Sequence, residues 1–167
     1  MSATTDTPNI GEMLAPFLAR IPEDHVPIFL ALAERRAAER YREWATRATS
    51  DEVRGQLLAC SAREEEIARR VEALVDDPRP MQATVTQAIP ELPDLISAAF
   101  DGQPLREQFT LQASGERLGA ATWRSLAAKA TDAATRDALP ACAELEEQSA
   151  EVLEALLAAP TWSFDGP

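Results

Sequence analysis

The sequence predicts an all-α protein, a four-helix bundle made of two helical hairpins. Three observations support this fold class. Ala, Leu, Glu and Arg dominate the 167 residues, whereas the chain holds only six Gly and one Tyr, a composition that favours helix. Four long segments place apolar residues at alternating steps of three and four, which is the spacing of one helix face. The second half of the chain also repeats the first, and the length suits one domain with its own core.

The repeat appears when the sequence is shifted by 82 residues. Residues 30–75 then align without a gap with residues 112–157, and 18 of the 46 positions are identical. A composition rich in Ala and Glu produces some identities by chance, but the matches include Cys60 with Cys142. We interpret the pattern as an internal duplication.

Each repeat predicts one helical hairpin, at residues 23–76 and 104–159. The four predicted helices run from about Glu23 to Ala48, Ser50 to Val75, Pro104 to Ala130 and Asp132 to Ala159. The sequence Thr49-Ser50-Asp51-Glu52 resembles a capping box at the start of the second helix. Pro140 lies inside the fourth helix, which therefore either kinks there or begins later.

Residues 77–103 connect the two hairpins and are rich in Pro, with a short helical pattern only at Leu92–Phe100. A connection this long can cross the length of a bundle, so we expect one long crossover between two hairpins with short internal links. The bundle then occupies residues 23–159, between an N-terminal extension at 1–22 and a tail at 160–167.

Both ends of the chain carry apolar patterns outside the bundle. The extension predicts a short amphipathic helix that either caps the bundle or meets a partner, and capping is favoured; its apolar residues are Ile10, Met13, Leu14, Phe17 and Leu18. The tail holds Trp162 and Phe164, which either pack back onto the bundle, the favoured expectation, or dock to another protein.

Charge and composition restrict the partners. A net charge of -12 argues against nucleic acid and anionic membranes, because their phosphates would be repelled. No segment reaches the roughly 18 to 20 apolar residues of a membrane span, and the N-terminus lacks a signal-peptide pattern, so we expect a soluble cytoplasmic protein. Cys60 and Cys142 are expected to be buried small hydrophobes and not a disulfide. A homodimer is expected by analogy with other bundles.

One glutamate interrupts the apolar seam of each long helix. In the second helix the seam reads Val53, Leu57, Cys60, Glu64, Ile67, Val71 and Leu74. The corresponding residues of the four helices are Glu34, Glu64, Glu116 and Glu146, and the repeat pairs the first with the third and the second with the fourth. All four are predicted to point into one core. A slip of one residue would instead put Glu65 and Glu147 at the edge of the seam.

Four bare carboxylates cannot share a dry core. A buried unpaired ion costs several kcal/mol, whereas a whole domain is stable by only about 5 to 15 kcal/mol. The charges must be neutralised by metal ions, by shared protons, or by a buried base. The seams hold no Lys or Arg, so the last route needs Arg63 or Arg117 to turn inward. Two divalent cations would cancel the four negative charges.

Residues 24–158 resemble the rubrerythrin and ferritin-like family in these motifs. The run Glu34-Arg35-Arg36-Ala37, followed by Tyr41, is similar to the family's first-helix signature, and Glu64-Glu65-Glu66-Ile67-Ala68-Arg69-Arg70 to its second. In that family the first and third helices each give a Glu, while the second and fourth each give Glu-x-x-His. Together these residues hold a di-iron or related two-metal centre.

The chain departs from the family pattern at both histidines. Their positions are occupied by Ile67 and Ser149, and a further Glu that is typical of rubrerythrins is replaced by Gly119. The single histidine, His25, lies about nine residues before Glu34, roughly 13 Å away along a helix, which is too far for a substitute ligand. The sequence identifies no catalytic residue and no organic cofactor.

Two functions follow from this pattern and stay open. In the first, the four glutamates bind two divalent metal ions, Fe or Mn, because an all-carboxylate site favours hard cations, and the protein is an oxidase, a peroxidase or a metal-handling protein. Tyr41 and Trp123 are then either redox-active rings near the site or ordinary core residues. In the second, the bundle is metal-free and acts as a scaffold, an interaction module or a binder of an apolar ligand.

Overall fold

The computed structural model describes residues 10–164, and within them the chain forms seven α-helices, one 3-10 turn and one isolated β-bridge. The elements in chain order are α1 (Ile10–Leu18), η1 (Glu23–His25), α2 (Val26–Arg47), α3 (Asp51–Glu72), α4 (Arg79–Ala88), α5 (Leu92–Phe100), α6 (Leu105–Lys129) and α7 (Ala133–Ala158). The prediction of an all-α protein is confirmed. The first nine residues of the predicted extension and the last three of the predicted tail lie outside the described part.

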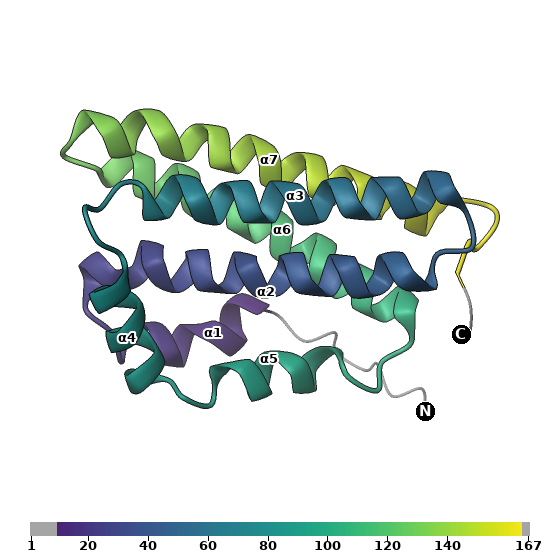
Figure 1. Cartoon of the computed structure of the whole chain (residues 1–167), viewed down its shortest axis with the longest axis horizontal. Helices are drawn as coiled ribbons and strands as arrows, with labels where there is room; N and C mark the ends of the chain where they lie inside the picture. Colours follow the sequence, from purple (N-terminus) through teal and green to yellow (C-terminus); the bar gives the residue numbers. More distant parts are fainter. Residues whose placement is uncertain (1–9, 165–167) are drawn as a thin grey trace, which may run out of the picture.

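The two predicted hairpins are present. Helix α2 packs along α3, α6 packs along α7, and α3 meets α7 between the hairpins (Figure 1). Side chains cap the second helix of each hairpin: the Ser50 hydroxyl accepts from the Val53 amide (3.4 Å) and the Asp132 carboxylate from the Thr135 amide (2.8 Å). Such caps stabilise a helix start by about 1 kcal/mol each. Both hairpins coincide with the predicted repeat units, and duplication itself stays a prediction.

Helix α7 runs through Pro140 without a break, so the alternative that it begins later is wrong. Proline has no amide proton, and the bond that it would donate to the carbonyl of Arg136 is missing. The neighbouring residues Leu139, Cys142 and Ala143 are fully buried. Their packing against the rest of the core offsets the lost hydrogen bond.

The buried apolar residues of the hairpins form two clusters. One contains Tyr41, Trp44, Phe109 and Leu153, and the other contains Ala31, Ile67, Val71, Trp123 and Leu139. On α3, Glu64 lies between Cys60 of the first cluster and Ile67 of the second. On each of the other long helices the glutamate also lies between a residue of one cluster and a residue of the other. The carboxylates therefore mark a polar layer where one apolar cluster gives way to the other.

Three short helices lie beside the hairpins on the side of α2 (Figure 1). Helices α1, α4 and α5 contribute to an apolar cluster with the start of α2; its buried members are Ile21, Phe29, Val85, Ile89 and Leu92. The predicted helix at residues 10–18 is present, and it contacts α6. Among residues 10–164, no helix is long and apolar enough to cross a membrane.

The described part of the tail packs back onto the hairpins. Phe164 is only 7% exposed, and its ring centroid lies 5.1 Å from that of Phe109. The Thr49 amide donates to the carbonyl of Ser163 (2.9 Å), which ties the tail to the turn between α2 and α3. A protein partner for this tail stays a prediction.

Candidate metal centre

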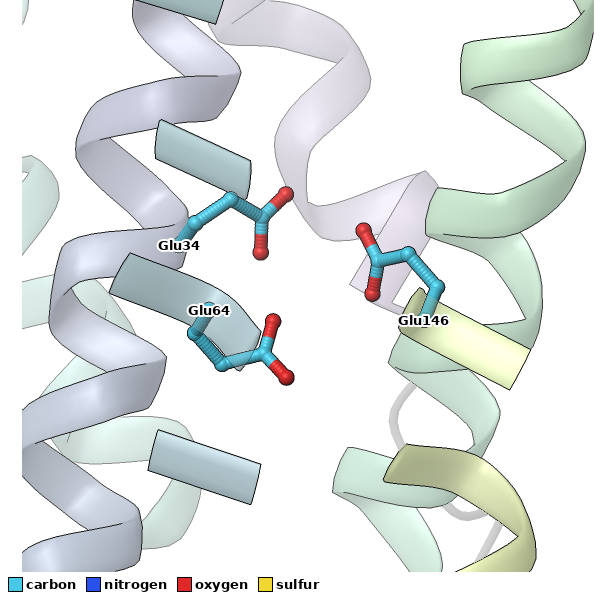
Figure 2. Close-up of side chains that lie close together, drawn as sticks. All are labelled: Glu34, Glu64 and Glu146. Atoms are coloured by element: carbon cyan, nitrogen blue, oxygen red, sulfur yellow. The ribbon is translucent and has the colours of Figure 1, made fainter. Parts of the chain in front are cut away.

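Three of the predicted carboxylates meet in the interior. Glu34 comes from α2, Glu64 from α3 and Glu146 from α7, and one carboxylate oxygen of each lies within 4.8 Å of the other two. Figure 2 shows the carboxyl groups of Glu34 and Glu64 directed toward that of Glu146. Glu64 is 0% exposed and Glu146 is 1% exposed. We call these three residues the carboxylate cluster.

The one-residue slip is ruled out. The Glu65 carboxylate accepts from the Arg35 guanidinium (2.6 Å) at the surface, and the Glu147 carboxylate accepts from Arg124 (2.8 Å). The side chains of both glutamates are 37% exposed. Their charges are solvated and paired, whereas the neighbouring Glu64 and Glu146 point inward.

Each buried member of the cluster accepts a hydrogen bond on one oxygen. The Trp123 indole donates to Glu146 Oε1 (2.8 Å), and the Ser149 hydroxyl donates to Glu64 Oε1 (2.7 Å). Glu64 Oε2 is buried and has no hydrogen-bond partner. A buried carboxylate oxygen without a partner carries a desolvation penalty of about 1 to 3 kcal/mol or more. A bound cation or a shared proton would remove that penalty.

Glu116 is also buried, at 1% exposed, but it is not part of the group of three. Its Oε1 accepts from the Tyr41 hydroxyl (2.7 Å) and from the Gln112 side-chain amide (2.7 Å). Its carboxylate is thus oriented by Tyr41 and Gln112 and does not meet the other three glutamates closely enough to join the cluster. That Glu116 binds a metal ion remains a prediction.

Arg40 is the basic residue that the seam pattern missed. Its guanidinium donates to Gln112 Oε1 (2.7 Å) and lies over the Phe100 ring, 3.7 Å from the centroid. Burial lowers the pKa of Arg40 to about 10, against the raising effect of Glu116. The only feature of the sequence that could have indicated its inward orientation is its position directly before Tyr41, which belongs to the apolar seam.

The two arginines considered for neutralising the core do not pair with it. Arg117 donates to the Glu154 carboxylate (2.7 Å) at the surface. Arg63 donates to the Gln148 side chain (3.2 Å) and lies near Cys60, with 3.5 Å between its Nη1 and the sulfur. Neither arginine forms an ion pair with the carboxylate cluster, although Arg63 favours the charged form of Glu64 from a distance and Arg40 attracts Glu116. Metal ions and shared protons remain the two ways to neutralise the three carboxylates of the cluster.

Burial shifts the acidities of the cluster strongly. Glu34 keeps some exposure because it lines a cavity, yet burial of its carboxyl group and the nearby Glu116 raise its pKa to about 8. Burial also raises the pKa values of Glu64 and Glu146 well above the usual range, and the neighbouring carboxylates add to the shift. Without a metal, the cluster therefore holds protons at neutral pH. A divalent cation has to displace them.

The substituted motif positions have different roles. Ile67 is 0% exposed and belongs to an apolar cluster, whereas Ser149 donates directly to Glu64. The remote His25 lies at the start of α2, where its ring contacts the Asp24 carboxylate (2.8 Å). The cluster thus contains oxygen donors only, and oxygen donors favour Mg, Ca, Mn and Fe over softer metals.

A cavity of about 320 Å³ reaches the carboxylates from the side of α1. Glu34, Glu116 and Glu146 line it together with side chains from α1, α2, α5 and α6. Most of the other lining residues are apolar. The carboxylates are therefore accessible to a molecule larger than a metal ion.

Comparisons of the chain with protein-family models, with curated proteins and with solved structures found no significant match. The resemblance to the ferritin-like family therefore depends on the motifs and the geometry given above.

Proposed function

We propose that this chain is a divergent ferritin-like four-helix bundle that binds divalent metal ions, Fe or Mn, at its buried carboxylates. The observation that carries the proposal is Glu64. Its carboxylate is fully buried, its Oε2 has no partner, and it faces Glu34 and Glu146 within 4.8 Å. Oxidase, peroxidase or metal-handling activity follows from such a site.

The donor set fits a hard cation. Glu34, Glu64 and Glu146 would hold one ion, and Glu116 would complete the charge balance for a second, since four carboxylates match two divalent cations. When bound, Fe or Mn supplies the electron transfer on which oxidase and peroxidase activities depend. The missing histidines remove two ligands, so we expect weaker binding than at a site with both imidazoles.

The surrounding residues orient the carboxylates. The Trp123 N–H and the Ser149 hydroxyl each hold one oxygen of a cluster glutamate, which leaves the second oxygen for a cation. Tyr41 holds Glu116 in the same way, and burial raises the pKa of Tyr41 well above its usual range, so its hydroxyl stays a donor. Hydrogen bonds of this kind tune metal affinity by roughly 10 to 100-fold.

The test is a metal titration of protein purified without chelator. We expect binding of about two Fe(II) or Mn(II) ions per chain, measured by calorimetry under anaerobic conditions and by elemental analysis. The Glu64→Gln variant should lose most of the binding, because a neutral amide replaces a charged ligand. Glu65→Gln is the matched control, since Glu65 pairs with Arg35 at the surface.

Absence of binding at millimolar metal, together with unchanged thermal stability, would refute the proposal and favour the metal-free bundle. The metal-free alternative makes its own prediction, because in that case the four carboxylates bind no metal ion. Replacing all four glutamates with Gln should then preserve the fold, and a collapsed variant or a metal-dependent parent would contradict that alternative.

A further inference from the structure

The cavity beside the carboxylate cluster is closed on one side by α1. Ile10, Leu14 and Leu18 of this helix line the cavity. None of the nine residues of α1 is buried, although Leu14, Phe17 and Leu18 pack against the apolar cluster at the start of α2, so the helix lies over the cavity. It approaches α6 closely at one point, where a Cβ on Gly115 would lie 2.8 Å from Ile10 Cδ1.

The opposite walls combine apolar and acidic side chains. Helix α2 contributes Val26 and Leu30 as well as Glu34, while α5 and α6 add Ile96 and Glu116. Ligand sites for small organic molecules are typically apolar pockets of roughly 300 to 1,000 Å³ with a few polar groups. This cavity, at about 320 Å³, has the size and the lining of such a site.

Charge decides which head group suits the polar side. Arg40 also lines the cavity; its guanidinium donates to Gln112, lies over the Phe100 ring and is attracted by the Glu116 carboxylate, so its charge is directed at a group of the protein itself. The carboxylates repel an anionic head group. Bound divalent cations would offset their charge, which removes the attraction for a cationic head group as well. An uncharged oxygen group that can both donate and accept hydrogen bonds remains the best match.

We propose that this cavity binds an apolar organic substrate with one uncharged oxygen head group, with the apolar body beneath α1 and the head group beside the carboxylates. The choice of head group rests on the proposed metal site, because the charge balance requires the bound cations. The apolar part of the inference rests on the cavity alone. Helix α1 is then the element that covers the bound substrate.

The test uses 1-decanol as the probe and a matched pair of variants. Thr122 and Thr110 both lie on α6, and each hydroxyl donates to the carbonyl four residues earlier, at Leu118 and Arg106. Thr122 lines the cavity, whereas Thr110 is exposed and is not among the lining residues. Phenylalanine at position 122 would occupy the cavity, and at position 110 it would extend into solvent.

We expect 1-decanol to bind metal-loaded protein in calorimetry and to slow hydrogen exchange in α1. Thr122→Phe should weaken binding at least tenfold, Thr110→Phe should leave it unchanged, and decanoate and decylamine should bind at least tenfold more weakly than the alcohol. Absence of decanol binding to metal-loaded protein, equal binding by Thr122→Phe, or a preference for a charged head group would each overturn the proposal.

A separate metal titration of the same sample distinguishes the two proposals. If metal does not bind, the proposed function fails, and decanol binding to metal-free protein that Thr122→Phe abolishes still supports the cavity as the site for an apolar molecule. If metal binds and decanol does not, the substrate proposal fails and the metal site stands.

Discussion

A Cβ atom on Gly119 would lie 2.4 Å from Oε1 of Glu146, which is closer than real side chains approach. Gly119 is on α6 and Glu146 on α7, so this contact joins the two helices of the second hairpin. The absence of a side chain at position 119 makes room for the carboxylate. The same oxygen accepts the hydrogen bond from Trp123 (2.8 Å), and the two neighbours together fix the orientation of Glu146.

Replacement of Gly119 by Ala should weaken metal binding. The new methyl group would displace the Glu146 carboxyl group and disturb its bond to Trp123, and loss of ligand orientation typically reduces metal affinity by about 10 to 100-fold. Gly55→Ala on α3 is the control, because no atom lies within 4 Å of its added Cβ. That substitution should stabilise the helix by about 0.5 to 1 kcal/mol and leave metal affinity unchanged, as measured by calorimetry and urea unfolding.

The stability of the metal-free protein should fall as the pH rises. The pKa of Glu34 is about 8 in the folded protein and near 4.5 in the unfolded chain. Between these values the folded state binds more protons, so the free energy of unfolding decreases with increasing pH. One pKa unit corresponds to about 1.4 kcal/mol, and the total loss is on the order of a few kcal/mol.

Urea unfolding in chelator from pH 5 to pH 9 measures this slope. The Glu34→Gln variant should show a shallower slope, since it lacks one of the groups that release a proton. Mn(II) should restore stability at pH 8 to 9, because the cation replaces the protons. A flat profile for the metal-free parent would contradict the raised pKa of Glu34.

The sequence predicted the long helices well because their apolar stripes are continuous. The same stripes placed Glu34, Glu64 and Glu146 in one interior region, since a charged residue inside a regular seam has only one direction to point. Helix α4 was missed, because the Pro-rich connection showed no full-length helical pattern. In the structure Pro78 and Pro80 lie at the N-terminus of this helix, where proline is favourable.

The hydrogen-bond partners of the carboxylates could not be predicted from the sequence. Periodicity places a residue on a face but does not give its rotamer, so it could not show that Tyr41 bonds to Glu116 while Trp123 bonds to Glu146. The predicted repeat aligns these two rings with each other, yet they donate to glutamates that the repeat does not align, Glu116 and Glu146. Arg40 was missed for the same reason, because its inward turn depends on stacking against Phe100.

Introducing a histidine at position 67 should strengthen the proposed metal site. Ile67 follows Glu64 by three residues on the same helix and is fully buried, so Ile67→His would place an imidazole near the cluster. We expect about tenfold tighter Fe(II) binding, with a larger gain for Zn(II), because imidazole is a softer ligand than carboxylate. Ile67→Gln is the matched control, since it adds a polar group without a good metal ligand. Equal affinities for the two variants would contradict the proposed resemblance of position 67 to the histidine position of the ferritin-like motif.

Truncation of the tail aromatic should affect stability and not metal binding. Phe164 packs against Phe109 and forms an isolated bridge with Ala48, which directly follows α2, at the opposite end of that helix from its start and well beyond Glu34. Buried Phe→Ala substitutions cost about 3 to 5 kcal/mol in protein cores, and we expect roughly 2 to 3 kcal/mol for Phe164→Ala because its side chain keeps 7% exposure. Ser163→Ala is the control, since its backbone carbonyl keeps the bond from Thr49. Urea unfolding gives the stability and calorimetry the metal affinity; an unchanged midpoint would show that the tail does not contribute to the fold and would favour a docking role.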